Sequence, residues 1–593
     1  MSKHVYDSGI IGNCAYIAHV RKDTNISWLC WPRFDSGFIF GALLDKEKGG
    51  EFSILPEKEF TSVQYYVENT NVIITEVTSA GGTYRITDFA PRFHLYERYY
   101  RPMMLIRKIE PLNGHPRIKV TCAPVTNYGE KKLKAVMGSN HLEFTGLEDP
   151  LRLTTNFSIN FILNGQYHVL NEVKYLVLTY GTPLEAPLEI TADDFLRRTV
   201  SYWQGWIKNT GINIIYQQPV IRASLALKLH QYEDTGAIIA SSTTSLPEVN
   251  GSGRTWDYRY CWLRDSYYLL NAFNNIGHFE EAENYFHFIT NVVEQDEKRY
   301  DPLYTITGSP IIEEVELPLE GYLGNKPVRI GNKASAQIQN DTYGQVMLSL
   351  LPLYTDRRFI FEERHDSSTW IRNILAKITK TIDEKDAGIW EFRNTTQYHC
   401  YTNLFQWAGC KAAIKMAKFI GDKALENMAN ELLAKATEKI EACYDPERKV
   451  YTQAIGVSDL DASTLQLIMM NYLDPGSQRA KDHLLALEAE LKADKGLFYR
   501  YIHADDLGRP QTTFLFTAFW HVEALACVGR VDEAVQQFEE LLKCTNHLGL
   551  MSEDIDETDG SQWGNFPQTY SHVGLMNAAN RIARKLDKPN FFV

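Results

Sequence analysis

The sequence lacks the motifs by which most cofactor-dependent and nucleophilic enzymes are recognised. Its 593 residues contain no CxxC pair, no Walker-type GKS/T loop, no GxGxxG, no HExxH and no GxSxG. The sequence therefore contains no motif that indicates zinc, nucleotide or serine-hydrolase chemistry. The nine cysteines are scattered and odd in number, which favours reduced thiols over a disulfide framework. We therefore expect a cytoplasmic protein.

Long apolar runs and an excess of positive charge are also missing. No segment reaches the roughly 18 uninterrupted apolar residues of a membrane span, and residues 1–23 make a poor signal peptide because Asn13 interrupts their apolar stretch. The 74 acidic residues outnumber the 61 basic ones, giving a formal net charge of -13. Nucleic acid and anionic membranes repel a net anion, so we expect neither as a partner and favour a neutral ligand.

The chain has two parts with different hydrophobic periods. In the first part, short β-branched and aromatic runs such as NVIITEV and YLVLTYG alternate with turn residues. These runs predict an antiparallel β-sandwich over residues 1–190, with hairpins at Gly81-Gly82 and Asn113-Gly114. A chain of this length exceeds what one hydrophobic core supports, so a second domain is expected.

Helical spacing begins after the predicted sandwich. Residues 191–216 predict a helix that joins the two parts, and residues 217–593 contain about twelve candidate helices. An even number suggests paired helices, whereas an α-solenoid, the alternative, would show a fixed sequence repeat that is not seen. Glycine-rich insertions at 250–255 and 299–333 separate some helices, and such loops are where binding groups usually lie.

One segment combines indoles, phenols, arginines and aspartates just before and within the start of a predicted helix: TWDYRYCWLRDS, residues 255–266. Aromatic faces stack on the apolar side of a sugar ring, while Arg and Asp side chains form charge-assisted hydrogen bonds with its hydroxyls. A buried structural network at a helix N-terminus is the alternative. The mixture favours a sugar-binding pocket.

With this segment in view, the chain resembles glycoside hydrolase family 15, which contains glucoamylases and trehalase-like enzymes. The shared motifs occur in the family's order and include SWLCWPRFDSGF, TWDYRYCWLRDS, LPLEGYLGNKPVRIGN, QNDTYGQ, GIWEFR, GLMSEDID and GNFPQTYSHVGLMNAA. One motif alone would be weak, but several in one order are specific. The resemblance implies a multidomain fold, an N-terminal antiparallel β-sandwich packed on a C-terminal all-α (α/α)6 barrel. It also implies inverting, exo-acting hydrolysis that releases β-glucose from non-reducing ends.

The resemblance implies two catalytic glutamates. Inversion needs one carboxylic acid to protonate the leaving oxygen and one carboxylate to activate water on the opposite face of the sugar. Glu391 of GIWE matches the family's general acid, and Glu553 of LMSED matches its general base. We expect the apolar neighbours of Glu391 to help keep it protonated. Two carboxylates and a water suffice for this reaction, so neither a metal nor an organic cofactor is expected.

Other residues match the family's sugar-binding positions. Arg264 and Asp265, which follow Trp262, match the residues that hold the hydroxyls of the non-reducing glucose, and Arg500 matches a second hold on that sugar. The alternative for Arg264 and Asp265 is a structural ion pair. Weaker candidates for substrate binding are Asp257, Tyr258, Asn340, Asp341 and Trp390.

The sequence leaves the substrate open among several α-glucosides. Trehalase-like members tend to follow the acid motif with a His-Ser-Lys stretch, whereas HCYTNLFQWAGC stands here, with Asn403 and Leu404 at the corresponding places. Phe392 replaces the second glutamate of many fungal glucoamylases, and QNDTYG, with Asn340, is closer to the glucoamylase form. We rank malto-oligosaccharides first, trehalose second and α-1,6-linked glucans third. An inactive carbohydrate-binding protein on the same fold is the alternative of a different class.

Overall fold

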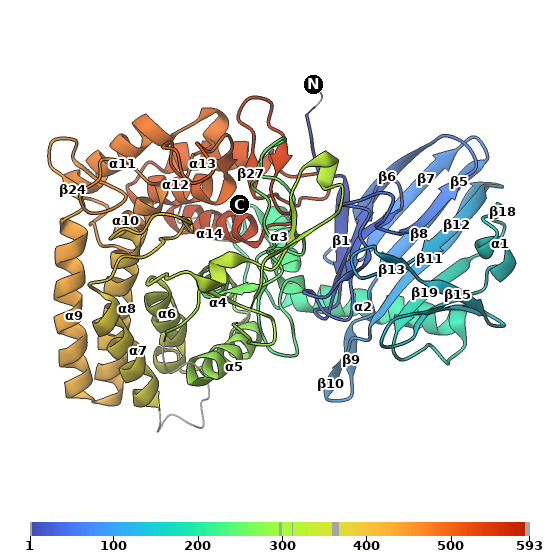
Figure 1. The fold of residues 1–593 in the computed structure, drawn as a ribbon, viewed down its shortest axis with the longest axis horizontal. Coiled ribbons are helices and arrows are strands. Elements are labelled where there is room, and N and C mark those ends of the chain that lie inside the picture. The colour runs from blue at the N-terminus through green and yellow to red at the C-terminus, as the bar shows by residue number, and fades with distance from the viewer. Residues whose placement is uncertain (1–2, 296–298, 311, 359–366, 587–593) are drawn as a thin grey trace.

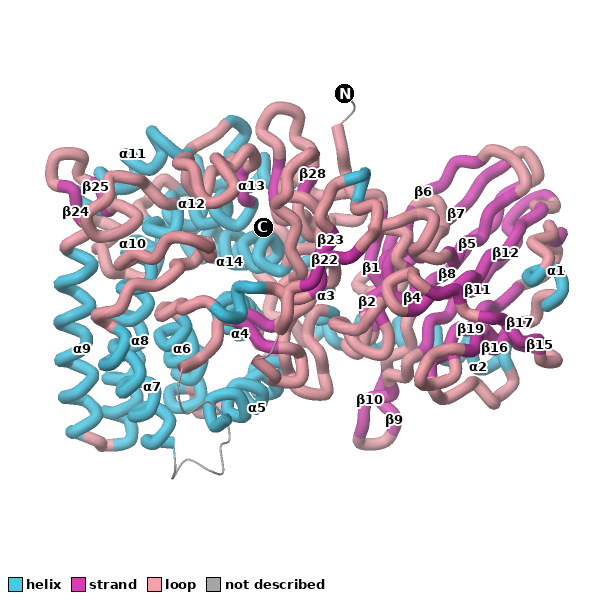
Figure 2. Tube along the Cα trace, viewed as in Figure 1, coloured by secondary structure: helices cyan, strands magenta, loops and turns pink. Residues whose placement is uncertain are grey.

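The computed structural model describes residues 3–295, 299–310, 312–358 and 367–586, which form two unequal halves (Figure 1). Strands fill the N-terminal half and helices fill most of the C-terminal half (Figure 2). The predicted fold class, an antiparallel β-sandwich followed by an (α/α)6 barrel, is confirmed. The domain limits at residues 190 and 216 stay predictions. None of the helices in the described ranges is both long and apolar enough to cross a bilayer.

The N-terminal half contains one large antiparallel sheet faced by two smaller ones. The eight strands of the large sheet are β6 (Phe60–Tyr66), β7 (Ile73–Ser79), β8 (Gly82–Phe89), β11 (Met104–Gly114), β15 (Lys134–Met137), β16 (His141–Thr145), β17 (Leu151–Thr155) and β19 (Lys174–Tyr180). The smaller sheets are formed by β1 (Ser8–Gly12), β2 (Ile17–Arg21), β3 (Ile26–Cys30) and β4 (Phe38–Phe40), and by β5 (Glu51–Pro56), β12 (Arg117–Ala123) and β18 (His168–Val169).

Alternating apolar residues fill the space between these sheets, as the period of two requires. Phe52 and Ile54 of β5 share a buried core with Ile86 of β8 and with Leu105 and Ile109 of β11. Sheet order in the large sheet is β15-β16-β17-β19-β11-β8-β7-β6, so strands distant in sequence lie side by side in its centre. The sandwich therefore has one contiguous core of its own.

The two predicted hairpins had different outcomes. Gly81-Gly82 joins β7 to β8, as predicted. Asn113-Gly114 does not join two paired strands, because β11 ends there in the large sheet while the next strand, β12, pairs with β5 in a smaller one. This prediction was wrong because the chain crosses between sheets at Gly114, whose φ of +69° suits a sharp turn without a β-carbon.

Helix α2 (Leu188–Lys208) overlaps residues 191–216, which were predicted to form a helix that joins the two parts. Ala192 and Phe195 cover the outer face of the large sheet, where they contact a cluster that includes Phe89 of β8. Trp203 and Ile207, near the other end of the helix, belong to the core of the helical half. A single amphipathic helix thus packs on both halves.

Twelve helices follow α2 in the described part of the chain. They are α3 (Gln217–Leu229), α4 (Leu263–Asn275), α5 (Phe279–Gln295), α6 (Thr342–Thr355), α7 (Ser367–Thr381), α8 (Cys400–Ile420), α9 (Lys423–Glu441), α10 (Gln466–Met469), α11 (Gln478–Leu491), α12 (Leu515–Cys527), α13 (Val531–Leu542) and α14 (Thr569–Leu586). Their positions follow the predicted periodicity.

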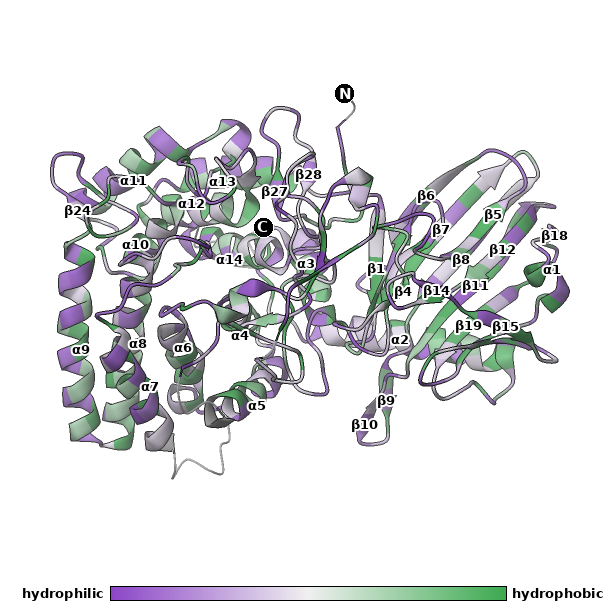
Figure 3. Ribbon diagram, in the orientation of Figure 1, coloured by the Kyte–Doolittle hydropathy of each residue, from purple (hydrophilic) through white to green (hydrophobic). Residues whose placement is uncertain are grey.

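These helices form two rings. The even-numbered helices make the inner ring: α4 packs on α6, α6 on α8, α10 on α12, α12 on α14, and α14 back on α4, while η3 (Ala462–Leu465), which leads directly into α10, packs on α8. The odd-numbered helices lie outside them. Inner α12 is buried from Leu515 to Ala526, whereas outer α9 alternates between hydrophilic and hydrophobic stretches (Figure 3). This is the pattern expected of a ring enclosed by a second ring.

The small β1–β4 sheet packs directly on the helical half. Trp28 and Phe38 belong to the same core as Leu225 and Leu229 of α3. The indole N–H of Trp28 also donates a 2.7 Å hydrogen bond to the carbonyl of Ser242. The contact between the halves is therefore apolar at its centre and fixed by polar contacts.

Candidate active site

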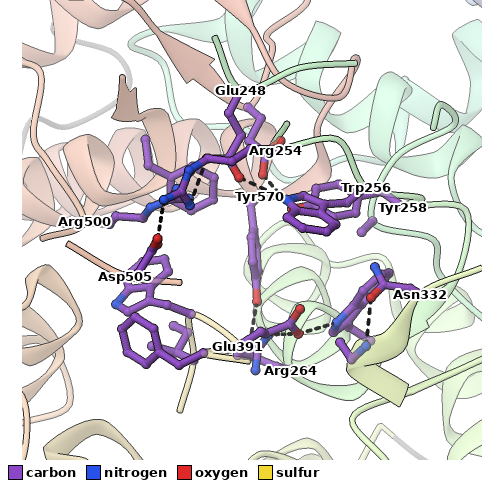
Figure 4. Close-up of a pocket in the computed structure, with 18 of the residues that line it drawn as sticks. Glu248, Arg254, Trp256, Tyr258, Arg264, Asn332, Glu391, Arg500, Asp505 and Tyr570 are labelled. Atoms are coloured by element: carbon purple, nitrogen blue, oxygen red, sulfur yellow. Dashed lines mark hydrogen bonds and ion pairs between the residues drawn. The ribbon is translucent and has the colours of Figure 1, made fainter. Parts of the chain in front are cut away.

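A pocket in the helical half brings the two predicted catalytic glutamates together. Glu391 and Glu553 both line it, although they lie in different loops far apart in the sequence. Figure 4 shows Glu391 beside Arg264 on one side of the pocket, Glu248, Arg254, Arg500 and Asp505 on the other, and Tyr570 extending between them. Of the predicted sugar-binding residues, those that line the pocket are Tyr258, Trp262, Arg264, Asp265, Trp390 and Arg500.

The pocket has a buried floor and an exposed rim. Trp262, Arg264, Asp265 and Tyr570 are only 3% to 7% exposed. By contrast, the lining residues Arg393, Asp506 and Leu507 are exposed. The end of a ligand that reaches the floor is therefore shielded from water. The dielectric constant is low there, so electrostatic interactions with the polar groups of the floor are strong.

Three hydrogen-bond donors converge on one oxygen of Glu391. Its Oε1 accepts hydrogen bonds from Trp262 Nε1 at 2.8 Å, Arg264 Nη2 at 3.0 Å and Gln339 Nε2 at 3.2 Å. The prediction that Glu391 has apolar surroundings is therefore wrong for Oε1, because indole, guanidinium and amide groups from other elements donate hydrogen bonds to this oxygen. The backbone of Glu391 adopts a φ of +60°, a left-handed conformation uncommon for a non-glycine residue. Such strain is concentrated at functional sites.

Glu553 is buried just before the short strand β27 (Asp554–Ile555). Its Oε1 accepts a 2.8 Å hydrogen bond from the Tyr258 hydroxyl, and its Oε2 accepts one of 3.2 Å from the backbone N–H of Asn565. Burial raises the pKa of Glu553, the negative charge of Glu248 raises it further, and Tyr258 and Arg500 act against this rise. Glu553 is thus a carboxyl group whose ionisation depends on its donors.

The Arg264–Asp265 pair sits in the first turn of α4, on the pocket floor. Arg264 donates to Gln339 Oε1 at 2.5 Å and to the Tyr570 hydroxyl at 3.2 Å, in addition to Glu391. Burial raises the pKa of Asp265 to about 7, although Arg264 opposes the rise. The Arg264 guanidinium can donate to one sugar hydroxyl, while the Asp265 carboxylate accepts a hydrogen bond from the neighbouring hydroxyl.

Ion pairs make up the other side of the pocket. Arg500 pairs with Glu248, and Arg254 pairs with Asp505. Arg254 also donates a 2.7 Å hydrogen bond to the carbonyl of Gly508, so the loop around Asp505 is tied to the loop around Arg254. Of these residues, the sequence identified only Arg500.

The structure corrects the prediction for Asp257. This residue does not line the pocket, and its side chain is fully buried in an ion pair with Arg259, with Nε–Oδ1 and Nη2–Oδ2 distances of 2.9 Å and 2.7 Å. Arg259 in turn donates a 2.8 Å hydrogen bond to the carbonyl of Ser36 in the N-terminal half. Asp257 is placed by this pairing on the side of its segment that faces away from the pocket.

Asn340 and Asp341 also lie behind the pocket wall and do not line it. The backbone N–H of Asn340 donates to Asp386 Oδ2 at 2.9 Å. Asp341 Oδ2 accepts a 2.8 Å hydrogen bond from Gln345 and lies 3.7 Å from Arg264 Nη1. Asp341 supports Arg264 from behind the pocket wall, because its buried carboxylate lies close to the Arg264 guanidinium.

Several lining residues were missed by sequence reasoning. Tyr570 lies within the motif GNFPQTYSHVGLMNAA, and Tyr501 directly follows Arg500. Arg254 and Asn332 lie in the two glycine-rich insertions where binding groups were expected. For Glu248 there was no signal, since an isolated glutamate in a loop looks like a solvated one.

The residues that made the substrate uncertain lie elsewhere. Asn403 and Leu404 are buried within α8, and the Asn403 side chain donates to the carbonyl of His399 at 2.8 Å. Neither residue lines the pocket. The sequence difference after the acid motif therefore does not alter the pocket wall directly.

Comparison with known proteins identifies the family. The model for glycosyl hydrolases family 15 matches residues 215–580, and the model for the trehalase-like N-terminal domain matches residues 3–169. This chain belongs to glycoside hydrolase family 15. The family 15 chain is 32% identical to a trehalase from Thermoplasma volcanium, over 98% of this chain and 94% of that protein. It is 30% identical to a trehalase from Mycobacterium tuberculosis, over 94% and 87% of the two chains.

A solved structure supports the fold of this glycoside hydrolase. A bacterial glucoamylase complexed with acarbose superimposes with a TM-score of 0.70, covering 99% of this chain and 95% of that one. The two sequences are 16% identical, so the likeness speaks for the architecture alone.

Proposed function

We propose that this family 15 enzyme hydrolyses trehalose with inversion at the attacked glucose. The observation that carries this proposal is that Glu391 and Glu553 line one pocket whose floor holds Arg264 and Asp265. A pocket with a buried floor and a single exposed rim suits an exo-acting enzyme, which encloses one terminal glucose and leaves the second sugar toward the rim.

Glu391 acts as the general acid and protonates the glycosidic oxygen. Among the described residues, all three hydrogen bonds to its carboxyl group reach Oε1, which leaves Oε2 to carry the proton. Once the proton has moved to the leaving oxygen, the donors from Trp262, Arg264 and Gln339 stabilise the resulting carboxylate. This stabilisation favours bond cleavage, because it is greatest when negative charge develops.

Glu553 acts as the general base. It takes a proton from a water molecule that attacks the anomeric carbon on the face opposite the leaving oxygen, so the attacked sugar leaves as β-glucose. Arg264, Asp265 and Arg500 hold the hydroxyls of that sugar and fix the ring for attack. The acid leaves the reaction ionised and the base leaves it protonated, and exchange with solvent restores both.

Trehalose is placed ahead of malto-oligosaccharides, which reverses the order favoured by the sequence. Three relatives that are 30% to 32% identical to this chain and match over 87% to 97% of their own length are named trehalase. The residues that had favoured malto-oligosaccharides, Asn403, Leu404 and Asn340, do not line the pocket. Malto-oligosaccharides become the second candidate. Phe392, which stands where many fungal glucoamylases carry a second glutamate, lines the pocket and counts against them.

The test compares glucose release from trehalose, maltose, maltotriose and isomaltose by the wild-type protein and by Glu391→Gln and Glu553→Gln. We expect the highest kcat/KM on trehalose, β-glucose as the first-formed anomer of the attacked sugar, and a loss of about 100-fold or more in each variant. Faster turnover of maltotriose would favour glucan hydrolysis. Sugar-induced thermal stabilisation without any turnover would favour the inactive binding protein.

A further inference from the structure

Both carboxylate oxygens of Glu553 accept hydrogen bonds from residues whose neighbours in the chain contact the N-terminal half. Asn565 donates its backbone N–H to Oε2 at 3.2 Å, and Tyr258 donates its hydroxyl to Oε1 at 2.8 Å. Asn565 follows the short strand β28 (Gln562–Trp563), which pairs with β27 directly after Glu553. The contacts that fix these two donors come from residues near the N-terminus and from the β1–β4 sheet.

The first contact runs through a single peptide unit. The hydroxyl of Tyr6 donates a 2.8 Å hydrogen bond to the carbonyl of Gly564. That carbonyl belongs to the same peptide group as the Asn565 N–H, which donates to Glu553. A hydrogen bond to the carbonyl orients the peptide plane and polarises its N–H, so the donor to Glu553 is strengthened.

The segment before β1 is itself anchored on β28. The Tyr6 backbone N–H donates to Gln562 Oε1 at 3.0 Å, and the Gln562 N–H donates to the carbonyl of His4 at 2.8 Å. The His4 ring stacks on Trp563 with a centroid distance of 4.4 Å. Tyr6 is buried, and its ring stacks on Phe566 at 4.6 Å. These contacts leave the Tyr6 hydroxyl little freedom to turn away from Gly564.

The second contact runs through Arg259, the neighbour of Tyr258 in the chain. Arg259 is fully buried and donates to the carbonyl of Ser36, while its guanidinium lies 5.9 Å from the Trp28 ring. Both Ser36 and Trp28 belong to the N-terminal half. The backbone that carries Tyr258 is therefore fixed on the side opposite the pocket.

We propose that the N-terminal half positions the catalytic base, with Tyr6 as a positioning residue that acts on Glu553 through the Gly564–Asn565 peptide. The proposal rests on the assignment of Glu553 as general base under the proposed function. It gives the β-sandwich a direct part in the reaction, since the donors to the base depend on its contacts.

The charged and titratable groups around Glu553 define what a change at Tyr6 does. Glu248 faces it with a negative charge, Arg500 faces it with a positive one, Tyr258 donates to it and Asp554 follows it in the chain. The Asn565 N–H stabilises the ionised form of Glu553 and lowers its pKa. Weakening this donor leaves the other groups in place and raises the pKa of Glu553.

The test is Tyr6→Phe, which removes one hydroxyl and keeps the ring. We expect kcat on trehalose to fall by about 5-fold, with KM little changed, as for the loss of one hydrogen bond that acts in the transition state. We also expect the acid limb of the profile of kcat/KM against pH to move to higher pH, because Glu553 then stays protonated to higher pH. His4→Phe, which keeps a ring on Trp563 but loses the contact between Nδ1 and the Gln562 carbonyl, should act in the same direction.

The matched control is Tyr84→Phe. Tyr84 is buried in the sandwich core and donates a 3.0 Å hydrogen bond to the carbonyl of Ile54, far from the pocket. Thermal unfolding of all variants separates lost stability from lost positioning. A Tyr6→Phe protein whose kcat and pH profile match those of Tyr84→Phe overturns this inference alone, provided that Glu553→Gln is inactive. Turnover retained by Glu553→Gln would instead overturn the assignment of the base.

Discussion

Tyr258 links the two catalytic candidates. Its hydroxyl donates to Oε1 of Glu553 at 2.8 Å, and its ring lies edge-on to Trp262 with centroids 5.5 Å apart. The indole N–H of Trp262 donates to Oε1 of Glu391, also at 2.8 Å. Two adjacent aromatic rings therefore span the pocket wall from one glutamate to the other. A shift of either ring would change the hydrogen bonds to both glutamates.

Replacing Tyr258 by Phe is expected to lower kcat/KM by about 10- to 100-fold, since a hydrogen bond to a charged group is lost. Because the hydroxyl stabilises ionised Glu553, its loss raises the pKa of Glu553 and moves the acid limb of the pH profile to higher pH. Tyr268→Phe is the control, since its hydroxyl lies 2.9 Å from that of Tyr401 and it does not line the pocket. Equal effects of the two variants would contradict the expectation.

Replacing Glu248 by Gln should move the acid limb in the opposite direction. The negative charge of Glu248 raises the pKa of Glu553, so removing it lowers that pKa and leaves the base ionised at lower pH. The unpaired Arg500 adds to this shift, because its positive charge then acts on Glu553 without compensation. The profile of kcat/KM against pH measures the effect, with Asp505→Asn as a charge control on the same side of the pocket. A limb that stays in place or moves to higher pH would rule out this coupling.

Gly564→Ala is expected to abolish most of the activity. A Cβ there would lie 2.5 Å from Cβ of Glu553, so the base must move. Gly560→Ala is a matched control, because its φ of +78° is similar to the +74° of Gly564 while its Cβ would meet only the flexible end of Lys3. Both variants should lose about 1–2 kcal/mol of stability from the left-handed backbone. Activity measured at a temperature where both are folded should be lost in Gly564→Ala only.

Asp257→Ala is expected to act on stability. It leaves the buried charge of Arg259 without its partner, which costs about 3–5 kcal/mol in the free energy of unfolding. Glu76→Ala breaks a partly exposed pair with Arg85 and should cost at most about 1 kcal/mol. Urea unfolding measures both values. A raised KM for trehalose with unchanged stability would show instead that Asp257 binds substrate.

Much of the architecture could be predicted because local periodicity and tertiary packing agree in this chain. The runs NVIITEV and YLVLTYG are rich in β-branched and aromatic residues, as strands require, and they are found as β7 and β19. The buried inner helices carry the long apolar stretches that a ring enclosed by another ring requires. Trp262, Arg264 and Asp265 could be placed together because they are the N-cap residue and two first-turn residues of one helix.

What could not be predicted depends on which way a side chain points. In the extended segment 256–259, successive side chains point to opposite sides, so Trp256 and Tyr258 line the pocket while Asp257 and Arg259 face the interior. All four residue types suit a sugar site equally well in the sequence. The partners of Glu248 and Gly564 likewise come from distant loops, and no local pattern records such contacts.

Helix α2 and the β1–β4 sheet determine how the protein responds to heating and to truncation. Trp203 and Trp28 each pack into the core of the barrel. Separating the two halves would therefore expose to water the apolar surfaces by which each half contacts the other. We therefore expect heat to melt the whole protein in one cooperative step, and we expect a truncated barrel expressed alone to aggregate.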